Sequence, residues 1–383
     1  MREADNGRPL RVCAVIQAFR PTVGGAELQL ERLLPLLRCR GVSVTVLTRG
    51  YPGRPRVERI HDATVRRGLV AGRSPFASLS FIVGSLTHLA LHRRSFDLVH
   101  SHGALSEGAI ALGARLLALP AAVKVLRTGP FGDFATLASR PLGRARARLL
   151  VGHVWFIAVS KDARAELEGH GVRSDRIFDI PNGVDTAAYS PGTKDDRRRL
   201  RTELGLPDGA LGLFVGRLDP VKRVDLVIEA LAYVDDVELV VVGDGPDRTR
   251  LERVASTARL GDRVRFTGLV DNVADYLRAA DAFLLPSRGE GMSNALLEAM
   301  ACGLACAAAP AAGVRQLLAD GRGLVVEAEA PAAWGAALRT LVGDTPTREQ
   351  LGASAAEYVR LNYGLASTAD KLVSAYRRLL AAA

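Results

Sequence analysis

Two basic residues in the second half of the chain have a spacing suited to holding a diphosphate. Arg217 follows the apolar run LGLFVG (211–216), and Lys222 lies five residues later, before the next helical pattern. Two cations on one short loop after a strand can contact a single diphosphate, arginine through a bidentate fork and lysine as a point charge. The simpler alternative is a pair of solvated surface charges.

Two glutamates lie eight positions apart in the stretch SRGEGMSNALLEAMACG (287–303). Ser293 or Asn294 can cap the helix that begins there, and the amides at a helix N-terminus suit a phosphate. Glu290 precedes this helix and, as a carboxylate, suits the hydroxyls of a sugar rather than a phosphate. Glu298, one turn into the helix, either accepts hydrogen bonds from hydroxyls such as those of a ribose or is an exposed helix residue. A phosphate between two hydroxyl-binding carboxylates describes a nucleotide sugar.

The elements that position these residues alternate between apolar strands and helical segments. The predicted strands are runs rich in β-branched residues, at 10–17, 42–48, 96–102, 121–126, 155–160, 211–216, 237–243, 263–268 and 282–286. Such runs separated by helices favour parallel sheets covered on both faces, which is the α/β class. The turn-rich segment 181–199 interrupts this rhythm, which then restarts. We therefore predict two doubly wound, Rossmann-like domains facing each other across a cleft, with functional residues just after the strands.

Length and composition agree with this organisation. The 383 residues suit two domains, and 48% hydrophobic with 24% charged residues is a globular composition. No signal peptide or membrane span is expected, because the first strand-like run begins at Arg11 and the longest apolar stretch of the first half is interrupted by polar residues. The four cysteines form no C-x-x-C pair, and we interpret them as reduced thiols of a cytoplasmic protein.

The net charge of +10 is concentrated in the first half of the chain. Residues 1–185 contain 27 basic and 15 acidic residues, which predicts an anionic partner for this half. Nucleic acid is not expected, since aromatic residues are few and no recognition motif is present. Four arginines of SRPLGRARARLL instead predict peripheral contact with the anionic inner face of a membrane; they are Arg140, Arg144, Arg146 and Arg148. Genome composition is the alternative source of the charge, because 46 of the 51 basic residues are arginine.

Four sequence blocks resemble the signature blocks of retaining glycosyltransferases of the GT-B fold, the large glycogen-synthase-like group that includes glycosyl transferases group 1 and family 4. They are IPNGVDTAAYSP (180–191), FVGRLDPVKRVDLVIEAL (214–231), VVGDGPDRTRLE (241–252) and FTGLVDNVADYLRAADAFLLPSRGEGMSNALLEAMACG (266–303). The resemblance covers nearly the whole chain. It implies an acceptor-binding domain over 1–185, a donor-binding domain over 186–360 and a C-terminal helix, 361–383, that packs back toward the first domain.

The resemblance also implies roles for single residues. Arg217 and Lys222 would hold the donor diphosphate, Glu290 the transferred sugar and Glu298 the ribose. His102, at the end of an N-domain strand, would lie near the reacting centre. The remaining donor contacts would come from two loops, namely from Gly24 and Gly25 and from Gly291, Met292, Ser293 and Asn294. His100 makes a metal pair with His102 conceivable, but no carboxylate or thiol partner is evident, so no metal site is predicted.

The implied activity is transfer of a hexose-type sugar from a nucleotide-diphosphate sugar, with a UDP-sugar favoured, to a hydroxyl. The acceptor would be a glycolipid or polysaccharide precursor or a small metabolite. The chain contains no Asp-x-Asp triplet, so the nucleotide sugar is expected as co-substrate without a metal or other cofactor. The resemblance favours attack on the same face as the leaving group, with retention of configuration, over a covalent intermediate on a carboxylate.

Other activities remain open on the same fold. A nucleotide-sugar epimerase or a sugar phosphorylase would use the same Arg217 and Lys222 pair. A nicotinamide-dependent dehydrogenase is disfavoured, because GDGP (243–246) lacks the third glycine of a dinucleotide fingerprint. The chain departs from the family at Gln316, where many members have a glutamate, and in RTGPFGDF (127–134), which lacks a histidine that many relatives carry. These departures concern the donor pocket and the acceptor.

Overall fold

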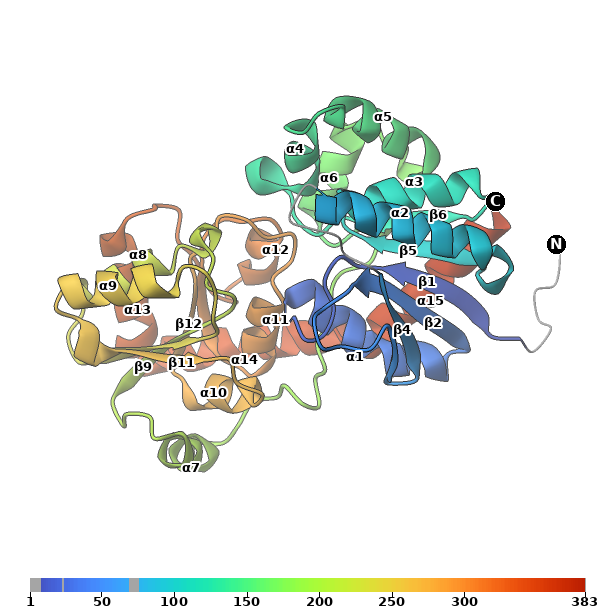
Figure 1. Cartoon of the computed structure of the whole chain (residues 1–383). Helices are drawn as coiled ribbons and strands as arrows, with labels where there is room; N and C mark the ends of the chain where they lie inside the picture. Colours follow the sequence, from blue (N-terminus) through green and yellow to red (C-terminus); the bar gives the residue numbers. More distant parts are fainter. Residues whose placement is uncertain (1–7, 23, 69–75, 383) are drawn as a thin grey trace. The chain divides into compact units, whose positions relative to one another are not determined.

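The protein, seen here as a computed structural model, is described over residues 8–22, 24–68 and 76–382 (Figure 1). It divides into two compact units. Unit 1 comprises Met1–Asn182 and Ala366–Ala383, and unit 2 comprises Gly183–Leu365. The division after residue 182 lies three residues before the predicted boundary. The chain returns from unit 2 to unit 1 between residues 365 and 366, five residues after the predicted boundary. The last helix therefore belongs mostly to unit 1.

Unit 1 is built on an eight-stranded sheet in the order β3-β4-β2-β1-β5-β6-β7-β8. Its neighbouring strands pair in parallel except β3 with β4, which is antiparallel. The strands are β1 (Leu10–Val15), β2 (Val42–Arg49), β3 (Val57–Ile60), β4 (Ala63–Gly68), β5 (Leu98–His102), β6 (Ala121–Lys124), β7 (Trp155–Ala158) and β8 (Ile177–Asp179). The central strand β1 is buried from Val12 to Val15, as a strand covered on both faces must be.

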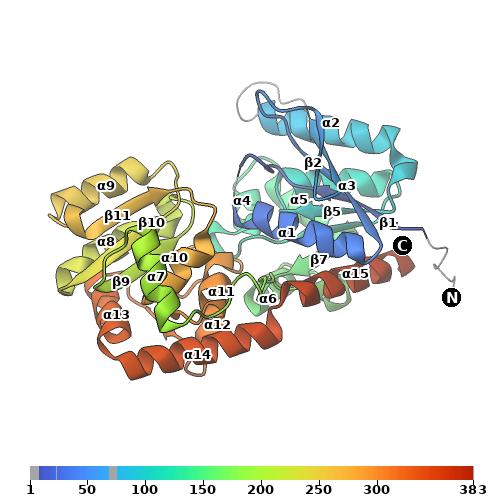
Figure 2. The same ribbon diagram turned by 90° about the horizontal axis from the view of Figure 1, so that it is seen from below.

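Helices cover both faces of the unit 1 sheet. They are α1 (Gly25–Cys39), α2 (Phe76–Leu91), α3 (Ser106–Leu116), α4 (Asp133–Ala138), α5 (Gly143–His153), α6 (Lys161–Gly169) and α15 (Leu365–Ala381), with short 3-10 turns η1 (Arg93–Ser95), η2 (Gly129–Phe131) and η3 (Ser174–Arg176). Figure 1 shows α2, α3 and α5 on one side of the sheet and α1 and α15 on the other. The helices α1 and α15 lie side by side in Figure 2, and Arg40 joins them through an ion pair with Asp370 at 2.6 Å.

Unit 2 is built on a six-stranded, all-parallel sheet in the order β11-β10-β9-β12-β13-β14. Its strands are β9 (Ala210–Val215), β10 (Val237–Val242), β11 (Val264–Gly268), β12 (Ala282–Leu285), β13 (Ala305–Ala308) and β14 (Leu324–Val325). Because β9 lies between β10 and β12, the loops that follow these three strands emerge next to one another at the carboxyl edge of the sheet.

The helices of unit 2 connect these strands. They are α7 (Lys194–Leu204), α8 (Val224–Ala230), α9 (Arg248–Thr257), α10 (Val273–Ala279), α11 (Asn294–Ala301), α12 (Val314–Leu318), α13 (Pro331–Gly343) and α14 (Thr345–Asn362), with 3-10 turns η4 (Pro220–Lys222), η5 (Leu231–Tyr233) and η6 (Gly261–Arg263). Local sequence explains where several of them begin and end. A capping box of Thr193 and Asp196 opens α7, and Gly205, with φ of 59°, ends it.

The predicted α/β class is confirmed, with a parallel Rossmann-like sheet in each unit. Each of the nine strands predicted from the sequence is present, and no predicted end differs from the observed one by more than two residues. The prediction missed the β3–β4 hairpin and the short strands β8, β13 and β14. In the described part of the chain, no helix combines the length and the apolar character needed to cross a membrane.

Candidate functional site

The loops after β9 and β12 bring together the residues of unit 2 that the sequence singled out. Strands β9 and β12 are neighbours and pair in parallel, so both loops leave the sheet at the same edge. A backbone hydrogen bond of 3.0 Å, from the Arg288 amide to the Val221 carbonyl, joins one loop to the other. Lys222 therefore lies within reach of the second loop.

Lys222 and Glu290 form an ion pair across these two loops. The Lys222 Nζ lies 2.5 Å from the Glu290 Oε1, and the two side chains are 22% and 10% exposed. An ion pair at this burial is only weakly screened by solvent. The alternative that Lys222 is a solvated surface charge is therefore wrong. The contact also shows that the Lys222 and Glu290 side chains lie side by side, so one ligand could contact both.

Arg217 lies on the loop after β9 and pairs with a residue of the same loop. Its Nε lies 2.9 Å from the Asp219 carboxylate, and its side chain is 53% exposed. The backbone around it is tied to the loop after β10, because the Leu218 amide donates to the Asp244 carbonyl at 3.0 Å. The guanidinium is thus presented at the edge of the sheet on a fixed backbone while staying open to a ligand.

The glycines of GDGP allow this close contact of loops. A Cβ at Gly243 would lie 2.0 Å from the Gly216 carbonyl oxygen, and one at Gly245 would lie 2.3 Å from that of Leu218. No side chain fits at either position. The motif therefore serves to hold the Arg217 loop in place, consistent with its failure as a dinucleotide fingerprint.

The E-x₇-E stretch forms a loop and the buried helix α11. Ser293 is the cap of this helix, and its hydroxyl accepts a hydrogen bond from the Leu296 amide at 3.3 Å. The positive end of the helix therefore points to the loop that carries Glu290. Gly291 and Met292 are buried and Asn294 is half-buried, so all the predicted loop residues line this helix start.

Glu298 is buried inside α11, with 6% of its surface exposed. The alternative that it is an exposed helix residue is therefore wrong. Its helix neighbours Leu296, Leu297 and Met300 are fully buried, as predicted for core residues. A buried carboxylate needs hydrogen-bonding partners, so Glu298 is not a solvated surface charge.

Two further residues show how the rim of this site is built. The exposed Arg288 pairs with Glu329, which Arg223 also contacts at 3.2 Å, so these arginines fix the loops to the segment before α13. Gln316, which the sequence marked as a departure from the family resemblance, donates through Nε2 to the Tyr363 hydroxyl at 3.2 Å. Its amide is used in packing within unit 2.

In unit 1, His102 ends strand β5 and is 3% exposed. Its ring stacks on that of His100, with the ring centroids 4.3 Å apart. His100 in turn is hydrogen-bonded through Nδ1 to the Tyr376 hydroxyl of α15 at 2.7 Å. Both ring nitrogens of His102 lack a partner among the described residues. Burial is the main cause that lowers the pKa of both rings, to about 3 for His100, so both are neutral.

Lys124 lies beside His102, because the two residues are register partners on β6 and β5. It is 5% exposed and donates a hydrogen bond to the Asn182 side chain at 2.8 Å. Burial lowers its pKa to about 8. A buried ammonium beside neutral imidazoles gives this edge of the unit 1 sheet a positive charge with few protein partners.

Two buried carboxylates lie at the same edge of the unit 1 sheet. Glu107, in the first turn of α3, accepts a hydrogen bond from the Gln17 amide at 3.1 Å. Asp133, in the first turn of α4, accepts one from the Leu126 amide at 2.9 Å. Burial, with a smaller contribution from Asp133, raises the pKa of Glu107 to about 7; burial also raises that of Asp133, to about 6.

Sequence reasoning missed Lys124, Glu107 and Asp133, although each left a signal. Lys124 is the one charge in the apolar run AAVKVL, where a strand buried on both faces has no need for it. Glu107 and Asp133 each follow the end of a predicted strand by a few residues, at the edge where parallel sheets bind ligands.

Gly24 and Gly25 lie at the start of α1, where Gly24 is the residue before the first helical turn. Gly24 has φ of −145°, an extended conformation that any residue adopts, and a Cβ there would meet only the end of the Glu27 side chain. The fold of unit 1 by itself therefore does not require glycine at position 24. The loop that leads to it includes Val23, which lies outside the described residues.

The described residues contain no group of three or more histidine, cysteine, aspartate or glutamate side chains arranged to hold a metal ion. His100 and His102 do come together, as the sequence suggested, but Tyr376 occupies one nitrogen of His100. The pair is better understood as a packed and hydrogen-bonded support for His102.

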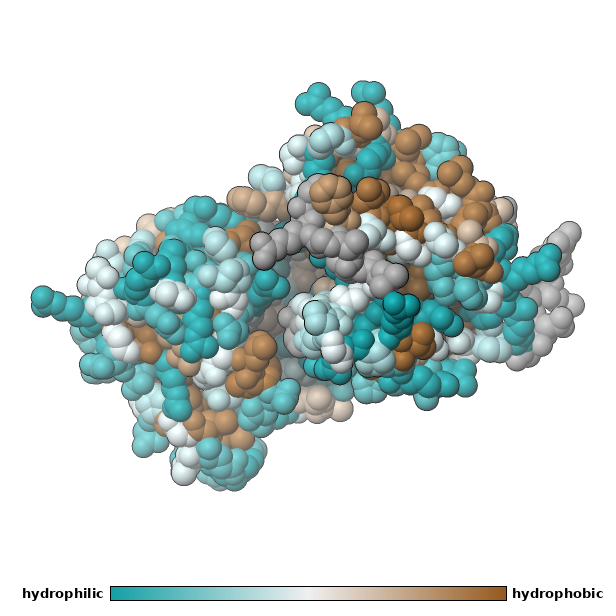
Figure 3. All heavy atoms as spheres, in the orientation of Figure 1, coloured by the Kyte–Doolittle hydropathy of each residue, from teal (hydrophilic) through white to brown (hydrophobic). Residues whose placement is uncertain are grey.

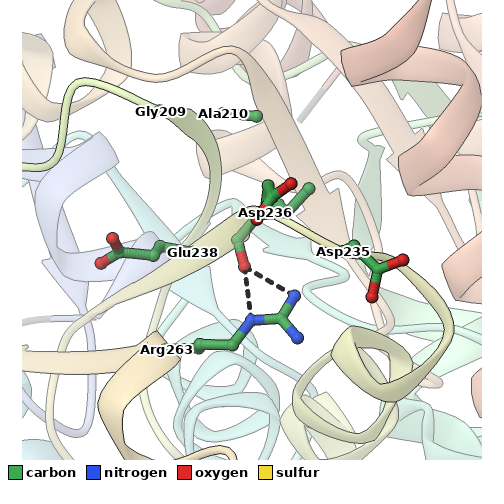
Figure 4. Close-up of a pocket in the computed structure, with 7 residues that line it drawn as sticks. Gly209, Ala210, Asp235, Asp236, Glu238 and Arg263 are labelled. Carbon is green, nitrogen blue, oxygen red and sulfur yellow. Dashed lines mark hydrogen bonds between the residues drawn. The ribbon is translucent and has the colours of Figure 1, made fainter.

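A pocket at the opposite edge of the unit 2 sheet is unrelated to these residues. It is lined by Asp235, Asp236 and Glu238 near the start of β10 and by Arg263 (Figure 4). Figure 4 shows the Arg263 guanidinium turned to the backbone, where it donates to the Val237 carbonyl at 2.9 and 3.1 Å. Three acidic side chains at the amino edge of a parallel sheet do not suit a phosphate.

The four arginines predicted to contact a membrane differ in their surroundings. Arg140, Arg144 and Arg148 are exposed, on or just before α5. Arg146 is half-buried and donates to the Leu105 carbonyl at 2.7 Å. Its inclusion in a surface patch is therefore wrong, because its guanidinium is used to hold α5 to the start of α3.

Comparison with known proteins identifies relatives along both units. Residues 23–188 match Glycosyltransferase Family 4, and residues 210–344 match Glycosyl transferases group 1. The D-inositol 3-phosphate glycosyltransferase of Kineococcus radiotolerans is 32% identical over 401 residues, which cover 93% of this chain and 90% of that protein. That of Mycobacterium tuberculosis is 30% identical over 421 residues, covering 98% and 84%.

Solved structures show the same fold at lower identity. Sucrose-phosphate synthase from Thermosynechococcus elongatus superposes with a TM-score of 0.84 at 22% identity, covering 98% of this chain and all of that one. Anabaena HepE in complex with UDP-glucose superposes with a TM-score of 0.80 at 19% identity, covering 96% and 100%. The chain therefore belongs to the glycosyltransferases of group 1 and family 4, and its two Rossmann-like units are those of the GT-B fold.

Proposed function

We propose that this glycosyltransferase moves a hexose-type sugar from a nucleotide-diphosphate sugar to a hydroxyl acceptor, with retention of configuration and without a metal ion. The observation that carries the proposal is the convergence of Arg217, Lys222 and Glu290 at the carboxyl edge of the unit 2 sheet, beside the start of α11. Two cations and a helix N-terminus suit a diphosphate, and an adjacent carboxylate suits a sugar hydroxyl.

The donor would bind in unit 2. Arg217, half-exposed on a fixed backbone, and Lys222, five residues later on the same loop, would take the two phosphates. Glu290 would accept hydrogen bonds from the sugar, and the buried Glu298 would accept from the ribose. A UDP-sugar is the donor to test first, since a protein of this fold has been solved with UDP-glucose.

The acceptor would bind at the carboxyl edge of the unit 1 sheet, where His102 and Lys124 end the paired strands β5 and β6 and where α3 and α4 begin with the buried Glu107 and Asp133. Carboxylates and neutral imidazoles hydrogen-bond to hydroxyls, and the Lys124 ammonium suits an anionic group of the acceptor. The relatives that are about 30% identical are named for an inositol phosphate acceptor. A phosphorylated polyol is therefore a suitable first acceptor in a screen that also includes lipid-linked sugars.

Catalysis in this proposal is mainly electrostatic. Arg217, Lys222 and the start of α11 would stabilise the negative charge that grows on the leaving diphosphate, the type of interaction with the largest expected effect on rate. The acceptor hydroxyl would attack on the face that the diphosphate leaves and would pass its proton to a departing phosphate oxygen. The new glycosidic bond would thus keep the configuration of the donor.

Donor hydrolysis tests the proposal without knowledge of the acceptor. The protein is incubated with a panel of UDP-, ADP- and GDP-sugars, and products are identified by mass spectrometry. We expect slow release of nucleoside diphosphate and free sugar from one nucleotide class, strongly reduced by Arg217→Ala. The matched control is Arg253→Ala, at an exposed arginine on α9 whose Nε donates to the Thr249 carbonyl of the same helix.

Two outcomes would contradict the proposal. Conversion of the sugar to an epimer without release of nucleoside diphosphate would indicate an epimerase. Equal loss of hydrolysis in the Arg217→Ala and Arg253→Ala variants would show that the loop after β9 has no specific role in the reaction. Once an acceptor is found, the coupling constant of the anomeric proton in the product, measured by NMR, distinguishes retention from inversion.

A further inference from the structure

Unit 1 exposes an unusual amount of apolar surface on one group of helices. Of the twelve large hydrophobic side chains that are exposed in the described structure, nine belong to unit 1. Seven of these lie on or directly beside α2, α3 and α5, namely Phe76, Leu79, Val83, Leu91, Leu116, Leu142 and Leu149. Single exposed apolar residues are normal on protein surfaces, but a cluster on adjacent helices marks an interaction site.

Helix α2 shows this most clearly. None of its sixteen residues is aspartate, glutamate, lysine or arginine. Its inward face packs through Phe81 and Leu89, which are buried. Its outward face carries Phe76, Leu79 and Val83 at helical spacing, and these are 69%, 58% and 55% exposed. A surface helix normally turns charged residues to water, so an uncharged outward face indicates contact with something apolar.

The three helices form one continuous surface. Gly113 of α3 lets Leu86 of α2 approach so closely that a Cβ would lie 2.3 Å from its side chain. Gly108 of α3 packs in the same way against Leu150 of α5. The helices lie on the same side of the sheet in Figure 1, and Figure 3 shows hydrophobic residues gathered over them. We name this surface the α2–α3–α5 face.

The charge on this face has one sign. The only acidic residue in the three helices is Glu107, which is buried and bonded to the Gln17 amide. Exposed basic residues stand among the apolar ones: Arg115 beside Leu116, and Arg144 and Arg148 on α5. Arg93 adds a further positive charge and donates to the Leu117 and Ala118 carbonyls, at 2.6 and 2.9 Å, just after the end of α3.

We propose that the α2–α3–α5 face docks unit 1 on the surface of an anionic lipid bilayer. Apolar side chains that enter the acyl boundary, with arginines at the level of the headgroups, match both features of such a membrane. A second copy of the chain fits less well, because a symmetric contact would bring the positive charges of Arg115, Arg144 and Arg148 close to the same charges of the second copy. This inference does not depend on the proposed sugar transfer.

Vesicle co-sedimentation tests the docking. The full chain is mixed with vesicles of phosphatidylcholine alone or with a large fraction of phosphatidylglycerol, at low and high salt. We expect binding only to the anionic vesicles and its release by salt, because the Debye length falls to about 3 Å at 1 M salt. Changing Arg115, Arg144 and Arg148 to glutamine should weaken binding by about 100-fold, because each arginine near an anionic surface strengthens binding by about fivefold.

Apolar variants separate docking from simple charge attraction. The double variant Leu79→Ser/Val83→Ser should weaken binding to anionic vesicles by about 10- to 100-fold. The matched control is Leu269→Ser/Leu361→Ser, which removes two exposed leucines from unit 2 and should leave binding unchanged. Circular dichroism and donor hydrolysis of each variant confirm that the chain is folded.

Three results would overturn the proposal. The first is no binding of the unmodified protein to anionic vesicles at low salt. The second is equal weakening by the α2 variant and the unit 2 control. The third is a protein that sediments as a dimer in the ultracentrifuge, does not bind vesicles and becomes a monomer in the Leu79→Ser/Val83→Ser variant, which would make the face a contact between two copies.

Discussion

Lys222 and Glu290 form a 2.5 Å ion pair that joins the loops after the neighbouring strands β9 and β12. In the proposed donor complex each of these residues has a different partner, a phosphate for Lys222 and a sugar hydroxyl for Glu290. A diphosphate that approaches Lys222 would compete with Glu290 for the ammonium and leave the carboxylate to the sugar. The pair therefore links phosphate binding to the sugar pocket.

The first prediction concerns the two cations. Lys222→Ala and Arg217→Ala should each weaken binding of the nucleoside diphosphate by about 1.5–3 kcal/mol, the range for hydrogen bonds to charged groups. The measurement is titration calorimetry with the diphosphate that the hydrolysis panel identifies. Arg253→Ala serves as control and should keep the affinity of the unmodified protein. Unchanged affinity in both site variants would remove the diphosphate assignment.

The second prediction separates the two glutamates of the E-x₇-E stretch. Glu298→Gln should weaken both the free nucleotide and the nucleotide sugar, because its proposed partner is the ribose that both contain. Glu290→Gln should not weaken the free nucleotide, because it removes the carboxylate that competes with a phosphate for Lys222, and it should lower turnover, because its proposed partner is the sugar. Calorimetry and hydrolysis rates distinguish the two. Equal loss of free-nucleotide binding in both variants would show that these roles are wrong.

Periodicity in the sequence was sufficient to find the main strands of both sheets. Strands such as β9 and β10 are continuous β-branched or leucine-rich runs, and a run of this kind is typical of a parallel strand buried on both faces. The strands that were missed lack this signal. Strand β13 is ACAA, without a β-branched residue, and β3 and β4 alternate with arginines at the sheet edge. Neighbouring strands rather than intrinsic preference decide their conformation.

The candidate site could be predicted where one short segment contains the whole signal. The E-x₇-E stretch carries its own loop, cap and helix, so Ser293 and Glu298 were placed correctly on α11. The cluster of unit 1 could not be found in this way. Lys124, Glu107 and Asp133 come from three different elements, and they share one edge of the sheet only because β5 and β6 are adjacent and parallel. Their burial, which shifts their pKa values, is a property of the folded chain alone.

The third prediction concerns metal ions. Arg217, Lys222 and the positive end of α11 supply the charge that a bound divalent cation would otherwise provide to the leaving diphosphate. Donor hydrolysis should therefore persist after dialysis against EDTA and should not rise when Mg²⁺ or Mn²⁺ is added back. The sample is checked for residual metal by mass spectrometry. Loss of hydrolysis with EDTA that Mg²⁺ restores would show that a metal takes part.

The last prediction concerns pH and Glu107. Burial raises its pKa from 4.5 to about 7 in the folded protein. Between these values the folded state keeps a proton that the unfolded chain releases, so folding stability is highest below pH 4.5 and falls as pH rises through 7. The loss amounts to about 3 kcal/mol in the free energy of unfolding. Glu107→Gln stays neutral and can still accept from the Gln17 amide, so it should not show this loss.

The experiment compares urea unfolding of the two proteins at pH 4.5 and 7.5. Trp155 lies in unit 1 and Trp334 in unit 2, and these are the only tryptophans, so a Trp334→Phe background lets fluorescence report unit 1 alone. The difference in unfolding free energy between Glu107→Gln and its parent should grow with pH in favour of the variant. Glu168→Gln, at an exposed glutamate of α6, should show no growth in favour of the variant, because hydrogen bonds from Ser174 and Arg164 lower the pKa of Glu168 and so act in the opposite direction. A difference that is the same at both pH values would mean that the pKa of Glu107 is not raised in the folded protein, and that burial does not control its charge.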